Sequence, residues 1–181
     1  MNRCLVCHNT LQPGSRAISP LFCSGACRQK AYRLRAKYPV PTAMLDARRW
    51  VRADGKKPMR LDGRNASSTN PRSWVSYAEA LASTVGDGFG VMMGDGLAVY
   101  DFDHCFTDTG RVKVGVERFI KGIAEPVLYV EVSCSGDGLH VFVRSEARSY
   151  RRGGVEFYSR ARFVRMTCCP FRGWKGVRAD A

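Results

Sequence analysis

Short runs of hydrophobic residues, separated by glycine, proline and polar turns, follow one another along most of the chain. The run over 89–102 is apolar almost throughout, and its glycines divide it into two strands that we expect to be buried. Period-two alternation predicts further strands at 127–133, 139–143, 153–159 and 161–167. Strands of this length mixed with a few helices indicate an α/β (α+β) fold.

Two segments of the same region carry the 3.6-residue period of a helix, at 73–83 and 112–126. Residues 48–60, which precede them, predict a strand, a turn and a second strand. In the first helical segment, three large side chains recur at helical spacing and are expected to pack in the core: Trp74, Tyr77 and Leu81.

The second buried strand ends in Asp101, Phe102 and Asp103. Because successive side chains on a strand point to opposite faces, the two aspartates share one face and the phenylalanine points to the other. Two carboxylates held this close repel each other unless a cation lies between them, and oxygen ligands favour Mg²⁺ or Mn²⁺. The pattern predicts a metal site for phosphoryl chemistry, with a solvated strand end as the alternative.

Four of the eight cysteines lie near the N-terminus, in a C-x2-C pair and a C-x3-C pair separated by fifteen residues that include a turn-rich stretch over 13–20. Two such pairs supply four thiolates to a tetrahedral Zn²⁺, so we predict a structural zinc site. His8 is an additional candidate ligand. Haem attachment at C-x-x-C-H would leave the second pair unexplained, and a redox dithiol would need a thioredoxin-like setting. The predicted zinc ligands are Cys4, Cys7, Cys23 and Cys27.

The chain has 29 lysines and arginines against 16 acidic residues, a formal net charge of +13. Such an excess attracts polyanions, either nucleic acid or an anionic membrane surface. A helix is predicted from Ser24, its N-cap, to about Tyr38. It carries basic residues without acids, which favours nucleic-acid contact over a merely solvated face. These basic residues are Arg28, Lys30, Arg33, Arg35 and Lys37.

Pro39 and Pro41 predict a stiff linker over 39–47, between a zinc module with its basic helix at 1–38 and a globular domain at 48–181. No apolar run approaches the length of a membrane span, and the first ten residues lack the apolar core of a secretory signal. We therefore expect a cytoplasmic protein with no membrane partner, in which the cysteines stay reduced.

The predicted turn between the strands at 127–133 and 139–143 carries hydroxyl, glycine and imidazole groups close together. Backbone N–H groups and side-chain donors of this kind can bind a triphosphate, although a plain hairpin turn is the alternative. The residues concerned are Ser135, Gly136, Gly138 and His140.

The order of these features resembles the catalytic core of the archaeo-eukaryotic primase superfamily, and more narrowly the bifunctional primase/polymerase (prim-pol) domains of phages and mobile elements. The resemblance spans about 48–167. It rests on GKKP at 55–58, STNPRSWVSYAEAL at 68–81, GFGVMMGDGLAVYDFDH at 88–104, Ser135 followed by GDGLHVFV at 136–143, and GVEFYSRARFVRMT at 154–167.

The resemblance implies an RRM-like sheet that carries the acids, and a DNA primase/polymerase that uses nucleoside triphosphates on single-stranded DNA by a two-metal mechanism. Asp101, Asp103 and Glu156 would hold Mg²⁺ or Mn²⁺, with Glu131 as the reserve for the third acid. His140 would contact the triphosphate and Ser135 would position it. Charge and position add three further candidate phosphate contacts, for which surface solvation is the alternative: Lys57, Arg160 and Arg162.

The C-terminal part departs from this pattern. Such domains usually continue beyond the last strand into a helical region and a helicase, and Cys168 and Cys169 stand where a glycine turn is more usual. A helicase, if needed, would be a separate partner, and the zinc module would hold template or the initiating nucleotide. The alternatives are a non-catalytic zinc-containing DNA-binding replication accessory or regulator, and a metal-dependent nuclease.

Overall fold

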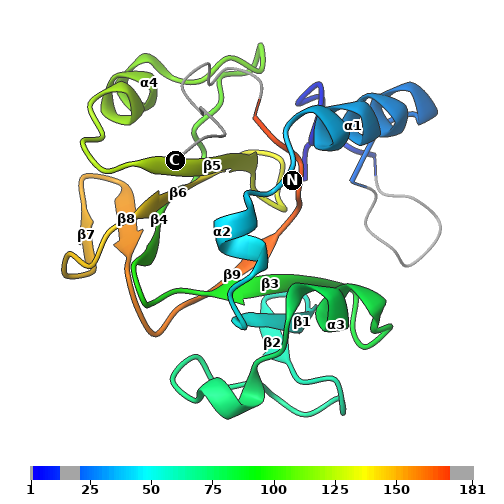
Figure 1. The fold of residues 1–181 in the computed structure, drawn as a ribbon. Helices are drawn as coiled ribbons and strands as arrows, with labels where there is room; N and C mark the ends of the chain where they lie inside the picture. The colour runs from blue at the N-terminus through cyan, green and yellow to red at the C-terminus, as the bar shows by residue number, and fades with distance from the viewer. Residues whose placement is uncertain (1, 13–20, 172–181) are drawn as a thin grey trace.

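A computed structural model of the chain describes residues 2–12 and 21–171 (Figure 1). Its α-helices are α1 (Gly25–Lys37), α2 (Thr42–Leu45), α3 (Tyr77–Ala82) and α4 (Val114–Lys121), with a 3-10 helix at Pro71–Ser73. Its strands are β1 (Trp50–Asp54), β2 (Lys57–Met59), β3 (Gly88–Met92), β4 (Leu97–Phe102), β5 (Val127–Val132), β6 (Leu139–Arg144), β7 (Tyr150–Arg152), β8 (Val155–Tyr158) and β9 (Phe163–Met166). The mixed α+β fold class is confirmed.

The larger sheet has five strands in the order β5-β6-β4-β8-β7, and every neighbouring pair is antiparallel. β4 and β5 are joined through α4 and leave β6 between them, which is a split βαβ arrangement. This is the first half of an RRM-like sheet. Residues 145–154, all of them described, lead from β6 to β8 through the hairpin strand β7 instead of a second crossover helix.

The smaller sheet has four strands in the order β2-β1-β3-β9 and lies below the larger one in Figure 1. One face of the smaller sheet packs against one face of the larger sheet, and the side chains between them form a common apolar core. This core is built from Trp50, Val91 and Val164 on the smaller sheet and from Leu97, Val99 and Phe142 on the larger sheet. The opposite face of β4, with Tyr100 and Phe102, packs under Ile120 of α4.

The N-terminal segment packs directly on the larger sheet, because Leu5 and Ala31 are buried in the same core as Tyr100 and Phe102. The segment predicted as a linker is also packed. Met44 of α2 is 1% exposed, and its backbone carbonyl accepts a 3.0 Å hydrogen bond from the indole of Trp50. The division into a module at 1–38 and a domain at 48–181 stays a prediction.

α1 is 13 residues long and begins at its N-cap Ser24, whose side chain accepts a hydrogen bond from the backbone N–H of Cys27. Its buried stripe consists of Ala31 and Leu34, and it ends before Tyr38. In the part of the chain that the structure describes, no helix combines the length and the apolar composition needed to cross a bilayer.

The helix predicted at 73–83 is shorter than expected. α3 begins at Tyr77, because Ser76 and Glu79 form a capping box there. Trp74 is buried but precedes the helix, and Leu81 is 55% exposed. The prediction that Leu81 packs in the core was therefore wrong, since a helix of this length turns one narrow face inward and Ala80 occupies it.

Candidate active site

The register of the larger sheet brings ionisable side chains into one row across its strands. Asp101 of β4 lies directly opposite His140 of β6 on one side and Glu156 of β8 on the other. His140 lies in turn opposite Glu131 of β5, and Glu156 lies opposite Arg151 of β7. Because directly opposite residues of antiparallel strands point to the same face, all these side chains share one face. We call this set the ionisable row.

Asp101 and Asp103 both line a cavity of about 490 Å³ between the two sheets, whereas Phe102 is buried on the other face. Burial raises the pKa of Asp101, and the neighbouring carboxylates Asp103 and Glu156 raise it further, against the opposing charge of His140. Carboxylates crowded in this way gain from a divalent cation placed among them. Asp101 and Asp103 therefore suit an oxygen-liganded Mg²⁺ or Mn²⁺ as they stand.

His140 also lines this cavity, and its Nε2 lies 3.7 Å from Oδ1 of Asp101. Its other nitrogen, Nδ1, is 3.0 Å from Oε1 of Glu131. Burial alone would lower the pKa of His140, but the hydrogen bond to Glu131 and the charges of Glu131 and Asp101 raise it overall. Glu131 thus fixes the ring with Nε2 on the cavity side, and the raised pKa favours the protonated form, in which both nitrogens donate.

Glu131 is 0% exposed and does not line the cavity. Besides His140, its carboxylate accepts hydrogen bonds from the backbone N–H and hydroxyl of Thr167 and from the N–H of Cys168, at 2.8–3.2 Å. A carboxylate whose oxygens are occupied in this way has little capacity left for a metal ion. Glu131 is placed to support His140, and Glu156 stays the predicted third acid.

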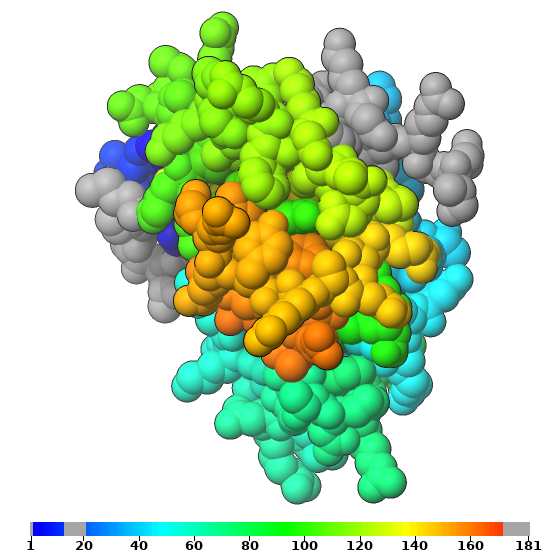
Figure 2. Space-filling model, turned by 90° about the vertical axis from the view of Figure 1, so that its left-hand side faces the viewer, coloured from blue at the N-terminus to red at the C-terminus, as the bar shows by residue number. Residues whose placement is uncertain are grey.

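Glu156 lines a neighbouring cavity of about 530 Å³ that it shares with Asp103. Its carboxylate is held by Arg151, with Nε 3.0 Å from Oε1, and by the Tyr158 hydroxyl, 2.6 Å from Oε2. Figure 2 shows this side of the molecule, where β7 and β8 in orange lie between the α4 region and the teal residues near 65. As placed, the three acids do not converge on one point.

The turn at 133–138 brings a second set of polar groups to the first cavity. Ser133 and Ser135 both line it, and their hydroxyl oxygens are 3.0 Å apart. The Ser135 hydroxyl also accepts a hydrogen bond from the backbone N–H of Asp137 at 3.2 Å. Gly136 and Gly138 are not among the lining residues, but a Cβ on Gly138 would lie 2.6 Å from the carbonyl oxygen of Phe102, so only glycine allows this approach to β4.

Three cations line the same cavity: Lys56, Arg162 and Arg165. Arg162 was predicted from the sequence, and its guanidinium lies over the Tyr158 ring, 4.3 Å from the centroid. Lys57 and Arg160 are exposed and do not line the cavity. Lys56 lies in the turn between β1 and β2, and Lys57 begins β2. Sequence reasoning missed Lys56 and Arg165, because the side chains of this turn and of β9 that reach the cavity depend on how the two sheets meet.

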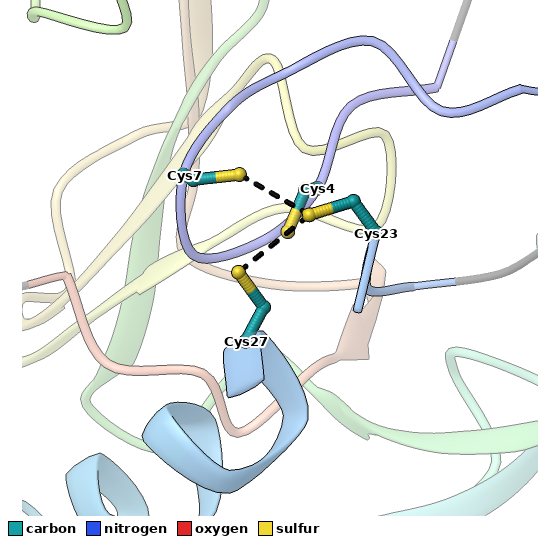
Figure 3. A group of neighbouring side chains, drawn as sticks. All are labelled: Cys4, Cys7, Cys23 and Cys27. Atoms are coloured by element: carbon teal, nitrogen blue, oxygen red, sulfur yellow. Dashed lines mark hydrogen bonds between the residues drawn. The ribbon is translucent and has the colours of Figure 1, made fainter. Parts of the chain in front are cut away.

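The sulfur atoms of the four N-terminal cysteines point toward one another and all lie within 4.8 Å (Figure 3). Sγ of Cys23 is 3.5 Å from that of Cys7 and 3.6 Å from that of Cys27. Sulfurs about 2.3 Å from a tetrahedral Zn²⁺ are about 3.8 Å apart, so the cluster fits zinc. Within residues 2–12 and 21–171, it is the one group of three or more potential ligands whose donor atoms converge in this way.

The surroundings of the cluster also suit a metal. Burial would raise the pKa of Cys4, but the backbone N–H groups of Cys23, Cys7 and Val6 point at its sulfur and lower the pKa to about 7. His8 takes no part, since its Nδ1 lies 3.1 Å from the carbonyl oxygen of Gly136. The turn residues predicted at 13–20 lie outside the described residues.

The basic residues predicted to contact DNA lie on the two flanks of the buried stripe of α1. Lys30, Arg33 and Lys37 recur at i, i+3 and i+7 on one flank and are exposed. Arg28 and Arg35 lie on the other flank. Tyr32, on the outer side of the helix between the flanks, is 65% exposed.

Comparison with known proteins points to one relative. The chain is similar to a DNA primase-polymerase of Nitratiruptor phage NrS-1, with 33% identity over 130 residues, which covers 65% of this chain and 18% of the relative. No family model matches the chain. The chain therefore spans less than a fifth of the length of that relative, and the similarity supports a relationship to the primase-polymerases.

We expect the chain to bind about one zinc ion, and replacement of Cys23 and Cys27 by serine to abolish binding, because two of four thiolate ligands are lost. Metal analysis of the purified proteins by mass spectrometry measures this directly. Cys134→Ser, outside the cluster, is the matched control and should retain zinc. Full zinc content in the double variant would refute the assignment.

Replacement of Glu131 by Gln should lower the free energy of unfolding by about 2–4 kcal/mol. The NH₂ group of Gln would point at N–H donors of Thr167 and Cys168 that now bind a carboxylate oxygen, and His140 would lose its carboxylate partner. Chemical denaturation followed by circular dichroism measures the change. Glu146→Gln, at an exposed position, should change stability by less than about 0.5 kcal/mol. Equal stability of the two variants would contradict the supporting role of Glu131.

Proposed function

We propose that this chain is a nucleotidyltransferase of the primase-polymerase type, which joins nucleotides on a single-stranded DNA template. The observation that carries the proposal is the ionisable row, because it brings Asp101 and His140 to one cavity beside Asp103. The relationship to a phage primase-polymerase supports the same reading. The combination of acids, an imidazole and cations in one cavity is what a reaction on a triphosphate requires.

Asp101 and Asp103 are the proposed metal ligands of the first cavity. Divalent ions held by these residues would supply activation of a 3′-hydroxyl and stabilisation of the leaving pyrophosphate. Glu156 completes the ligand set in this proposal by exchanging Arg151 and Tyr158 for the metal. Asp103 borders both cavities, so it would connect a metal ion in the first cavity with Glu156 in the second.

His140 and Ser135 are the proposed triphosphate contacts. The Nε2 of His140 is directed to the cavity while Glu131 holds Nδ1, so the ring is oriented to donate to a phosphate oxygen. Ser135, on the turn, lines the same cavity as His140. Lys56, Arg162 and Arg165 would neutralise the remaining phosphate charge.

The basic helix α1 is the proposed contact for single-stranded DNA. Its flanks carry cations for the phosphates, and the exposed ring of Tyr32 between them offers a face on which a base can stack. The proposal includes a cytoplasmic setting in phage or mobile-element replication.

Replacement of both Asp101 and Asp103 by Asn should lower nucleotide incorporation at least about a hundredfold, because the metal ligands lose their charge. The assay extends a primer on single-stranded DNA in Mg²⁺ or Mn²⁺, and a parallel reaction without a primer tests initiation. Thermal unfolding should show a folded protein. Asp46→Asn with Asp62→Asn, two exposed aspartates outside the cavity, is the matched control.

Retained synthesis in the Asp101/Asp103 variant would refute the site assignment. Pyrophosphate release that depends on added nucleotides distinguishes a polymerase from a nuclease, which would shorten DNA without them. Tight DNA binding with neither reaction would favour the non-catalytic accessory protein.

Binding of single-stranded DNA should weaken steeply with salt, and replacement of Lys30, Arg33 and Lys37 by Gln should reduce the slope of log K against log salt by about 2. Fluorescence anisotropy of a labelled oligonucleotide over a salt series measures the slope. Arg111, Arg118 and Lys121, replaced together by Gln, provide a control with the same change in net charge. An unchanged slope in the α1 variant would place the DNA contact elsewhere.

A further inference from the structure

The N-terminal segment that carries Cys4 and Cys7 is in direct contact with the turn at 133–138, although the two are far apart in the sequence. The backbone N–H of Arg3 donates a 2.8 Å hydrogen bond to the carbonyl oxygen of Ser135. His8 contacts the next carbonyl, that of Gly136, through Nδ1 at 3.1 Å. Arg3 Nε also lies 3.5 Å from Oδ1 of Asp137.

This contact leaves no space for a side chain. Gly136 has φ +73°, and a Cβ on it would lie 2.0 Å from the carbonyl oxygen of Arg3. The turn and the N-terminal segment therefore meet backbone to backbone, which only glycine permits at this position. A displacement of either segment moves the other.

The segment that makes the contact is shaped by the cysteine cluster. Arg3 and His8 flank the first cysteine pair, and the loop between them is closed by hydrogen bonds from Cys4 N–H to Asn9 and from His8 N–H to Cys4, both 2.9 Å. Cys23 and Cys27 approach the pair from the start of α1. A metal ion that joins the two pairs thus determines where the Arg3 and His8 groups are presented.

The other side of the turn contacts the residues that follow β4, the strand that carries Asp101. The carbonyl oxygen of Asp137 accepts a 2.9 Å hydrogen bond from the N–H of Cys105, and its carboxylate lies 2.8 Å from Nδ1 of His104. Both partners directly follow Asp103. The turn is therefore held between the cysteine cluster and the strand that carries Asp101 and Asp103.

We propose that the metal in the four-cysteine cluster holds the 133–138 turn in its nucleotide-binding shape through Arg3 and His8, so that metal occupancy sets nucleotide affinity. This proposal rests on the proposed role of the turn in binding a triphosphate. Arg3 is a positioning residue in it, since Arg3 acts on the nucleotide through Ser135 and Asp137.

The test compares the full chain with its Arg3→Gln variant, each with zinc and after treatment with a zinc-selective chelator. Hydrogen exchange of the 133–138 amides reports on the turn without any activity, and titration with a fluorescent deoxynucleoside triphosphate in Mg²⁺ reports on affinity. Removal of zinc from the unmodified chain should accelerate exchange in the turn and weaken nucleotide binding, each by roughly tenfold.

Arg3→Gln should retain its zinc and show a smaller loss of affinity, about threefold, because it removes the ion pair with Asp137 but leaves the backbone hydrogen bond to Ser135. The loss should appear in the KM for the nucleotide, with kcat changed less than about twofold. Removal of zinc from this variant should bring the loss to about the tenfold of the unmodified chain, because the backbone contact is then released as well. Arg118→Gln, an exposed position on α4, is the control and should behave as the unmodified chain does.

Faster exchange confined to residues 2–12 after zinc removal, with the turn and the affinity unchanged, would overturn the proposal. Unchanged affinity in Arg3→Gln after zinc removal would do the same. If no variant binds nucleotide, the proposed function fails together with the affinity part, whereas the exchange of the turn still decides whether the metal shapes it.

Discussion

The site depends on one constraint, the register of β4 between β6 and β8. The side chains of Ala98, Tyr100 and Phe102 fill the apolar core beneath α4, and those of Leu97 and Val99 fill the core between the sheets. A slip of one residue would exchange the two faces, turning Phe102 toward the cavity and burying Asp101 in hydrocarbon. Apolar packing on both faces therefore also determines where the carboxylates lie.

The buried charge of Glu131 extends this constraint to the rest of the described chain. A carboxylate with no exposure is tolerated only when its oxygens are hydrogen-bonded, and the donors come from His140 and from Thr167 and Cys168 after β9. β9 belongs to the smaller sheet, whereas Glu131 lies on the larger one. Satisfying one charge thus connects the two sheets beside the cavity and orients the imidazole that faces it.

Much of this arrangement could be predicted from local patterns. The apolar run over 89–102 and the alternation over 127–133 and 139–143 predicted the strands β3 to β6, and cysteine spacing predicted which thiolates would gather. Pairing across strands was not predictable in the same way, because it depends on register between distant segments. From the sequence, Glu131 is therefore predicted only as the reserve metal ligand. The pairing of β5 with β6 shows instead that it contacts His140. The prediction that Leu81 packs in the core was wrong because the length of a helix depends on its cap, here Ser76 and Glu79, as well as on periodicity.

The order of charges along the ionisable row indicates where a cation would stabilise the site most. An acid lies opposite a base at Glu131 and His140, at His140 and Asp101, and at Glu156 and Arg151. Within this row, Asp101 and Glu156 are the one directly opposed pair of like charge, and Asp103 adds a third carboxylate beside them. Like charges directly opposite one another destabilise a sheet. Arg151 relieves that repulsion from the outer edge while it holds Glu156, and a divalent cation would relieve it from between the acids. In the proposed site the two would be alternatives for the same carboxylate, so the release of Glu156 from Arg151 and the binding of a metal ion would belong to one equilibrium.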